Sequence, residues 1–305
     1  MANTDWYGNC YRQGFKNLGG TPMVTTFDAR KLVRYWKDAG AEVVFMNAFY
    51  QAYALYPSAV TIQDPFLKGR DLVREFCDAC AELKIKPAAY VTPQNHYPFM
   101  DGHPDWCQTK TDGTLHLGMP YMLPHAPYSD ACLNSPFVEK MEALLRECFG
   151  RYPFEAAFFD NAFTREGICH CRFCRARFKA ETGLDLPKRE DWADPVFRRA
   201  VQFKYDTFRR GMLRLAEAAR AVRPDLAIVF NNVSTTCHWC ACHGEELTEA
   251  LDYSCSESVV GSGHALERLG YAHDTVVSLA AFHLALLRGR SRRRQRKVQA
   301  YNYVV

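Results

Sequence analysis

Residues 28–47 read DARKLVRYWKDAGAEVVFMN. Up to Gly40 the apolar residues recur at intervals of three and four, which predicts an amphipathic helix from Asp28 to Gly40. The chain then enters Glu42–Asn47, a short apolar run typical of a buried strand. A helix that leads directly into a buried strand is the repeating unit of parallel α/β proteins, so this stretch predicts the fold class.

The same alternation continues along the chain. Further helices are expected at 69–83, 135–151 and 196–222, and strands at 87–92, 155–160, 225–232 and 252–257. Counting 6–11 as a first strand gives six strands by Glu257. No Gly-x-Gly-x-x-Gly turn follows a strand, which removes support for a dinucleotide-binding open sheet. We therefore predict a (β/α)₈ barrel that is two strands short of closure.

The chain end departs from this pattern. Residues 276–287 predict one more helix, and seven of the positive charges then lie between Arg288 and Lys297. We predict a barrel domain over residues 1–287 and a basic tail over 288–305, interpreted as a truncated or misread end, with a genuine functional tail as the alternative. Deleting this tail is expected to cost little stability.

Composition narrows the class of protein. The chain has 305 residues, of which 48% are hydrophobic, enough for the core of one large domain. The net charge is +4, but without the terminal run it is about −3, so the folded part lacks the basic face of a nucleic-acid binder. Neither a signal peptide nor a membrane span is evident, and we expect a cytoplasmic protein that binds neither nucleic acid nor membrane.

Polar and aromatic residues follow the predicted strands. In a barrel, the carboxyl ends of all strands meet on the face where active sites are built. Rings, amides and acids together suit a carbohydrate, because rings stack on sugar C–H faces and hydroxyls need paired donors and acceptors. The candidate substrate-binding residues are Asn47, Tyr50, Asn95, His96, Tyr97, Asn161, Asn231, Asn232 and Trp239.

Two acids end predicted strands. Asp160 closes an otherwise apolar strand, where an unpaired charge would be costly unless it faces a polar cleft. A helix cap or a loop ion pair is the structural alternative for this residue. Glu257 ends a later strand in the same way. Two carboxylates on one barrel face are what hydrolysis of a glycosidic bond requires.

The cysteines form a further pattern. Thirteen cysteines in a long chain without a signal peptide favour metal binding or free thiols over disulfides. Cys169, Cys171 and Cys174 have a C-x-C-x-x-C spacing that can fill three corners of a zinc tetrahedron. Cys132 is our candidate for the fourth ligand, with Cys107 and His170 as alternatives.

A second cysteine cluster lies at residues 237–243. It could form another metal site, or it could belong to a loop that carries Trp239 to the ligand. No Gly-x-Ser-x-Gly elbow or phosphate-binding P-loop is present, so serine hydrolases and nucleotidases lack support.

Three segments in a fixed order carry a resemblance to known families. They are the Cys-Leu-Asn-Ser-Pro-Phe segment that starts at Cys132, the Phe-Phe-Asp segment that ends at Asp160, and the C-x-C-x-x-C segment followed by Phe178. The chain resembles the hypothetical glycosyl hydrolase family six group and, more distantly, family 42 β-galactosidases. The helix at 69–83 and the strand at 87–92 also resemble α-L-fucosidases, and the likeness spans about residues 5 to 260.

This resemblance implies a glycosidase barrel with a structural zinc. Family 42 enzymes hold zinc with cysteines in this arrangement, which implies Cys132, Cys169, Cys171 and Cys174 as ligands. The fourth strand departs from family 42, whose Asn-Glu pair is replaced here by Asp160 and Asn161. Fucosidase-like barrels end that strand in a nucleophilic aspartate, which favours Asp160 as nucleophile, with the reversed role as the alternative.

These inferences combine into a functional hypothesis. The chain is expected to be a retaining glycoside hydrolase with Asp160 as nucleophile and Glu257 as acid and base, acting on a carbohydrate without an organic cofactor. The rival is a carbohydrate-binding barrel with a structural zinc and no turnover. The sugar and its linkage, retention against inversion of configuration, and the oligomeric state are open at this level.

Overall fold

A computed structural model describes residues 2–4, 23–49, 53–100, 102–116, 130–160, 167–232, 252–259 and 297–303. Its strands are β1 (Ala2–Thr4), β2 (Val43–Asn47), β3 (Lys86–Val91), β4 (Ala156–Phe159), β5 (Ala227–Asn232), β6 (Tyr253–Val259) and β7 (Lys297–Tyr303). Its helices are α2 (Met23–Thr26), α3 (Ala29–Asp38), α4 (Leu72–Leu83), α5 (Tyr97–Met100), α6 (Phe137–Arg151), α7 (Arg172–Thr182) and α8 (Pro195–Val222), with 3₁₀ turns η1 (Pro65–Leu67) and η2 (Pro104–Trp106).

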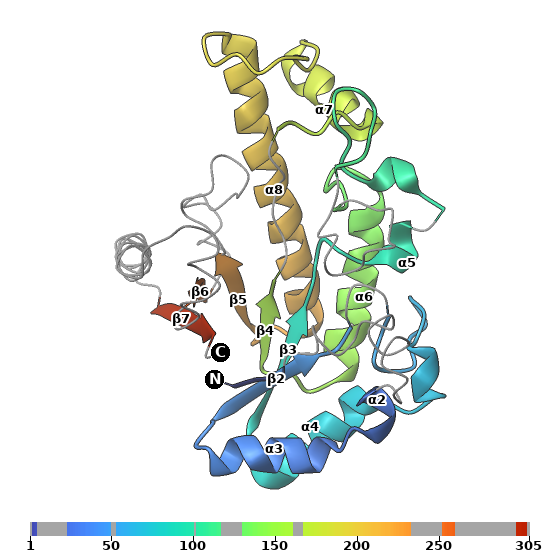
Figure 1. The fold of residues 1–305 in the computed structure, drawn as a ribbon, viewed down its shortest axis with the longest axis vertical. Coiled ribbons are helices and arrows are strands. Elements are labelled where there is room, and N and C mark those ends of the chain that lie inside the picture. Colours follow the sequence, from blue (N-terminus) through green and yellow to red (C-terminus); the bar gives the residue numbers. More distant parts are fainter. Residues whose placement is uncertain are drawn as a thin grey trace, which may run out of the picture.

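The strands form one parallel sheet in chain order, β1 to β7. A doubly wound sheet reverses its strand order at a switch point, whereas a (β/α)₈ barrel adds each strand beside the last. The described sheet never reverses, so the prediction of a barrel of the (β/α)₈ type is confirmed. Figure 1 shows the strands with α3, α4, α6 and α8 around them.

Local sequence explains where the helices begin. Asp28, Asp71 and Asp194 each precede a helix and accept a hydrogen bond from a backbone N–H of its first turn. Such caps satisfy donors that have no partner inside the helix. Helix α8 also has Pro195 at its start, where proline's fixed backbone angle suits a helix.

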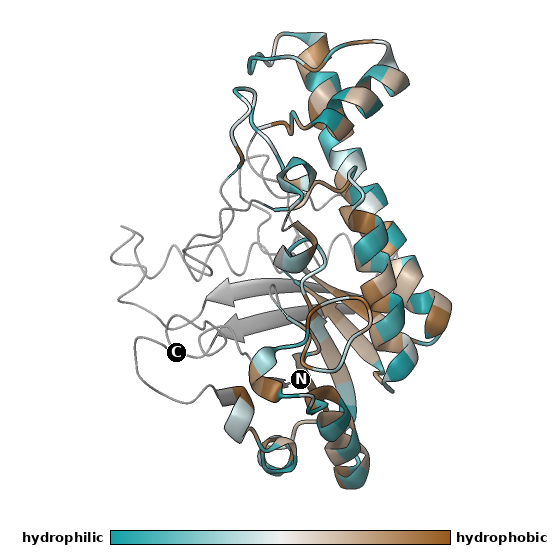
Figure 2. Cartoon of the chain, turned by 90° about the vertical axis from the view of Figure 1, so that its right-hand side faces the viewer, coloured by the Kyte–Doolittle hydropathy of each residue, from teal (hydrophilic) through white to brown (hydrophobic). Residues whose placement is uncertain are grey.

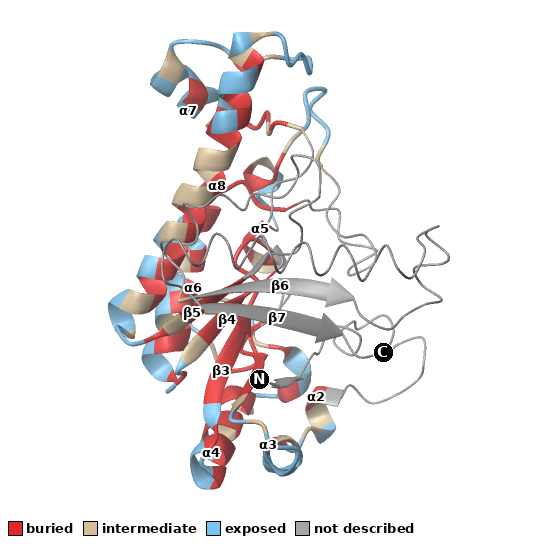
Figure 3. Cartoon of the chain, turned by 90° about the vertical axis from the view of Figure 1, so that its left-hand side faces the viewer, coloured by how far each residue is buried: buried red, intermediate tan, exposed pale blue. Residues whose placement is uncertain are grey.

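Alternation along the strands separates two cores. Residues that face the helices, such as Val44, Ala89 and Phe159, belong to the main core. Residues between them face the barrel interior, and we call these the inner cluster: Phe45, Ala88, Tyr90, Phe158 and Val229. Figure 3 shows β3 and β4 almost wholly buried, and Figure 2 shows apolar strands beside helices with hydrophilic outer faces.

A third core lies beyond the sheet. Helix α7 and the amino-terminal part of α8 extend past the carboxyl ends of β3 and β4 (Figure 1). They enclose a satellite core, defined as Cys132, Ile168, Cys171, Cys174, Phe178, Leu186, Phe197, Ala200, Val201 and Phe203. The sequence predicts α8 to within a residue, but α7 is only suggested there by the cysteines near its start.

The carboxyl-terminal end of the chain differs from the predicted tail, because it contains a strand. Residues 297–303 form β7, which pairs in parallel with β6 from Tyr253 to Val259. The sequence analysis missed this strand because it starts at the end of the arginine run, is only 7 residues long and lacks a regular alternation of apolar and polar residues. The strand expected at 6–11 and the helix expected at 276–287 lie outside the described residues.

Candidate active site and metal centre

Asp160 lies at the carboxyl end of β4. Its backbone N–H donates to the Val91 carbonyl at 3.0 Å, which continues the ladder between β3 and β4 by one residue. Phe158 belongs to the inner cluster, and Asp160 follows it by two positions, so both lie on the interior side of the strand. The side chain is buried, and the Tyr90 hydroxyl donates a hydrogen bond to its Oδ2 atom. Asp160 is therefore a buried carboxylate on the inner face.

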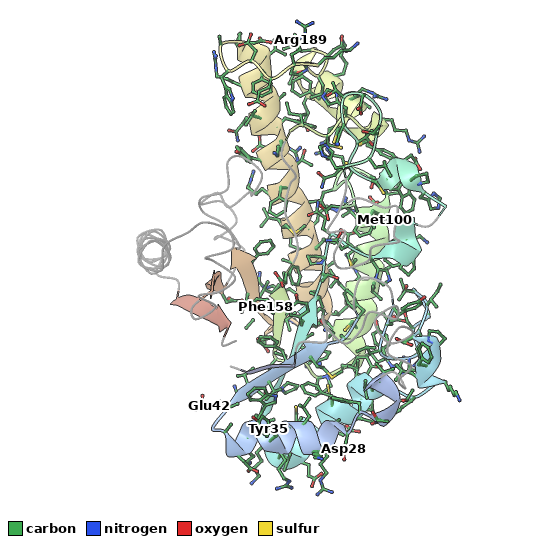
Figure 4. All side chains as sticks on the ribbon, viewed as in Figure 1. Asp28, Tyr35, Glu42, Met100, Phe158 and Arg189 are labelled. Atoms are coloured by element: carbon green, nitrogen blue, oxygen red, sulfur yellow. The ribbon has the colours of Figure 1, made fainter. Side chains whose placement is uncertain are left out.

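Stacked rings lie below this carboxylate. The Phe158 ring stacks on Tyr90, with centroids 5.5 Å apart, and on Phe45, with centroids 5.3 Å apart. Phe158 comes from the centre of the described sheet, where Figure 4 labels it. Three neighbouring strands thus supply one ring each to a packed layer next to Asp160. This packing restricts the position of the Asp160 side chain.

Asn47 ends β2 in the same register row. It pairs with Tyr90 of β3, which pairs in turn with Phe158 of β4. Its side chain is buried, and among the described residues its Oδ1 is an acceptor without a hydrogen-bond partner. A buried acceptor without a donor is costly, so this atom needs a donor from outside the described contacts.

The segment after β3 is packed more tightly than the sequence suggests. The Thr92 hydroxyl donates to the Asn95 carbonyl, and both residues are buried in this turn. His96 is fully buried, its Nε2 lies 2.6 Å from the Thr61 hydroxyl, and its ring makes an edge contact with Phe99. His96 is thus tied to the core as well as to the strand end.

The remaining predicted ligand residues are only partly described. Glu257 does not end its strand as predicted, because β6 continues to Val259; its backbone pairs in register with Tyr301 of β7. Asn231 and Asn232 end β5, opposite Cys255 and Ser256. The side chains of Glu257, Tyr97, Asn231 and Asn232 lie outside the described residues, as do Tyr50, Asn161, Trp239 and the second cysteine cluster at 237–243. These assignments therefore stay predictions.

Four cysteines converge beside the strand ends. The Sγ atom of Cys132 lies 3.4 Å from those of Cys171 and Cys174, and the four sulfurs, with Cys169, all lie within 4.8 Å of one another. A tetrahedron of Zn–S bonds near 2.3 Å places its sulfurs about 3.8 Å apart. Among the described residues, these four form the one group of three or more potential ligands that could hold a metal ion.

Backbone and amide donors surround the sulfurs. The Asn134 N–H lies 3.4 Å from Cys132 Sγ, its Nδ2 lies 3.3 Å from Cys174 Sγ, and the Cys174 N–H lies 3.4 Å from Cys171 Sγ. Such donors stabilise negative sulfur and orient it. Hydrogen bonds among the thiols lower the pKa of Cys171 and raise that of Cys132, so Cys171 is the sulfur that ionises more readily of the two. The donor set therefore fits a thiolate-bound metal.

The two alternative fourth ligands lie elsewhere. The Cys107 thiol contacts the Met100 thioether at 3.7 Å, and His170 is buried with its backbone N–H bonded to the Thr109 carbonyl. Burial lowers the pKa of His170. Neither belongs to the group that could hold a metal, whereas Cys132 does.

A pocket borders the cysteine cluster. Its empty volume is about 400 Å³, and it lies between the loops around Gln94, Gln108 and Cys132 and the face of α8 that carries Lys204 and Thr207. The sequence analysis missed this pocket, and it also missed Tyr90 and Asn134. Strand alternation from Ala88 could have indicated Tyr90, because every second residue of β3 faces the interior.

The part of the chain that contains Asp160 matches the model of a known family. Residues 28–161 match the model of the family described as Hypothetical glycosyl hydrolase 6. The matched region includes β2 to β4, Asp160 and Cys132, and it confirms the resemblance drawn from the sequence. No curated protein matches the chain. Among the described residues, no helix combines the length and apolar character that a membrane span requires.

Solved structures show the same fold. An α-L-fucosidase isoenzyme 2 from Paenibacillus thiaminolyticus matches with a TM-score of 0.58 and 16% identity, over 91% of this chain and 43% of its own. The β-galactosidase from the psychrophilic Marinomonas ef1 matches with a TM-score of 0.63 and 12% identity, over 96% and 47%. That of Bacillus circulans sp. alkalophilus gives 0.62 and 15%, over 88% and 41%. This chain spans less than half the length of these proteins.

Proposed function

We propose that the chain is the barrel part of a retaining glycoside hydrolase. The observation that carries the proposal is the buried Asp160 carboxylate at the carboxyl end of β4, on the interior side of a glycosidase-type barrel. Active sites of such barrels lie at this end. The family match over residues 28–161 gives independent support for glycoside hydrolysis.

In the proposed reaction, an Asp160 oxygen attacks the anomeric carbon and the bond to the leaving oxygen breaks. Glu257 gives its proton to that oxygen, and a covalent glycosyl–Asp160 ester results. Glu257 then takes a proton from water, which attacks the anomeric carbon and releases Asp160. The Asn47 amide oxygen is proposed to accept a hydrogen bond from a sugar hydroxyl, which would supply its missing donor.

The test is a panel of aryl glycosides with wild type, Asp160→Asn and a control, Asp64→Asn. Asp64 is also buried, but its carboxylate caps η1 by accepting from the Phe66 N–H, a role that asparagine can fill. We expect Asp160→Asn to lose at least about 10³-fold in kcat while its melting temperature is kept, and Asp64→Asn to stay active. Product configuration, read by NMR, should be retained.

Other outcomes are equally informative. An unaltered rate in Asp160→Asn would remove this residue as nucleophile, and inversion of the product would exclude the covalent intermediate. Binding of oligosaccharides without release from any glycoside would favour the rival, a carbohydrate-binding barrel without turnover.

We further propose that Cys132, Cys169, Cys171 and Cys174 hold a structural Zn²⁺. Their sulfurs lie within 4.8 Å of one another, and four thiolates complete a tetrahedron without an open position for substrate. The ion would tie the loop before α6 to the start of α7, and so it would contribute to folding rather than to chemistry.

Elemental analysis can test this with a matched pair of variants. Wild type should contain about one zinc per chain. Cys132→Ser should lose zinc together with thermal stability, whereas Cys107→Ser, which alters a buried thiol outside the cluster, should keep its zinc. Zinc-free wild type with an unchanged melting temperature would contradict the proposal.

A further inference from the structure

Tyr90 contacts the proposed nucleophile, but it has no role in the proposed reaction. It lies in the barrel interior, 3% exposed, and its hydroxyl donates to Oδ2 of Asp160. The two residues come from neighbouring strands and are not close in sequence, so the contact exists only in the folded barrel. Hydrogen bonds between a neutral donor and an ionised acceptor are stronger than bonds between neutral groups.

The Tyr90 ring has little freedom to move. It stacks on Phe158, whose ring stacks on Phe45, and all three rings are nearly fully buried. The packing of β2, β3 and β4 therefore fixes the position of the Tyr90 hydroxyl. A donor held in this way restricts rotation of the carboxylate to which it bonds.

We propose that Tyr90 is a positioning residue that fixes the Asp160 carboxylate for attack, an inference that rests on the proposed function of Asp160. A nucleophile contributes most when it is held in its reactive geometry before the substrate arrives. Tyr90 acts through Asp160 and bonds to it before and after substrate enters. Its loss therefore slows the chemical step and leaves substrate binding almost unchanged.

A second Tyr–Asp pair, with a half-buried carboxylate, supplies the control. The Tyr152 hydroxyl bonds both oxygens of Asp71, at 2.9 and 2.8 Å. Tyr152 caps the end of α6, and Asp71 caps α4 and also pairs with Arg151, so this pair has the same kind of hydrogen bond but no place at the strand ends. Tyr90→Phe and Tyr152→Phe each remove one hydroxyl from one Tyr–Asp pair.

The experiment measures kcat, KM and melting temperature in both variants. Tyr90→Phe should lower kcat about 10- to 100-fold and keep KM within about twofold, the size expected for a hydrogen bond to a charged group. Tyr152→Phe should lower the melting temperature and leave kcat as in wild type. Equal kcat in wild type and Tyr90→Phe, or an equal loss of kcat in both variants, would overturn the proposal.

A second readout separates this inference from the proposed function. In protein labelled with ¹³C at aspartate Cγ, the signal lost in Asp160→Asn belongs to Asp160, and it should move in Tyr90→Phe but not in Tyr152→Phe. If no glycoside is cleaved by wild type and the signal still moves, the proposed function fails while the hold of Tyr90 on Asp160 stands. An unmoved signal overturns the inference. Should Tyr90→Phe not fold, fluorotyrosine at position 90 keeps the ring, and its more acidic hydroxyl should still change kcat.

Discussion

Gly211 shows how a single residue lets α8 pack against the loop that carries Cys132. A Cβ atom at Gly211 of α8 would lie 2.8 Å from Leu133 Cβ, next to Cys132. We expect Gly211→Ala to lower the unfolding free energy by about 1–3 kcal/mol, because the helix or the loop must shift. Gly150 of α6 is the control, since its nearest neighbour would be Val222 Cβ at 3.7 Å. Gly150→Ala should stabilise by about 0.5–1 kcal/mol in urea unfolding.

The buried thiol of Cys80 predicts a pH dependence. Burial raises the pKa of Cys80 from its ordinary value near 9 to about 12. Between these values the unfolded chain has lost a proton that the folded chain keeps, so stability falls as pH rises above 9. The fall is up to about 1.4 kcal/mol per pH unit. Urea unfolding at pH 8, 9 and 10 should show a shallower decline in Cys80→Ala, and an equal decline would contradict this.

At the scale of elements, the residue that caps the carboxyl end of α4 limits the stability of the protein. Lys84 caps this helix with φ at 55°, in the left-handed region that glycine adopts without strain. Lys84→Gly should therefore raise the unfolding free energy by about 1 kcal/mol. Lys140, exposed within α6, is the control, because Lys140→Gly should lower it by about 1 kcal/mol. Urea unfolding compares the two, and a loss in both would contradict the argument.

The same scale shows what sequence patterns can predict. The helices near 28–40, 69–83, 135–151 and 196–222, and the strands β2 to β6, follow from periodicity and caps to within a few residues. Helix α7 does not, because its buried residues face a core that forms only around the cysteines. Asp160 could be predicted as a strand-end acid. Its bond to Tyr90 could not, because the partner depends on the register between β3 and β4.

At the scale of the whole molecule, β7 changes the expectation for the chain end. Removing residues 288–305 deletes β7 and the whole ladder that it forms with β6 from Tyr253 to Val259. Such a truncation should unfold at lower urea and aggregate more readily than the full chain. A control that replaces Arg292, Arg293 and Arg294 with glutamine keeps β7 and should match wild type. Unchanged unfolding and solubility after truncation would restore the prediction of a dispensable tail.

Helix α8 joins the barrel to the satellite core. Its 28 residues span about 42 Å, with Phe197 and Ala200 in the satellite core and Phe208 and Leu215 in the main core. The two halves of one helix therefore depend on different contacts. A partial opening that releases α7 and the first turns of α8 would leave the rest of the helix docked on the sheet, so amide hydrogens in the first half should exchange sooner than those in the second. The satellite core can thus open as its own cooperative unit while β4, which leads into Asp160, stays paired with its neighbouring strands.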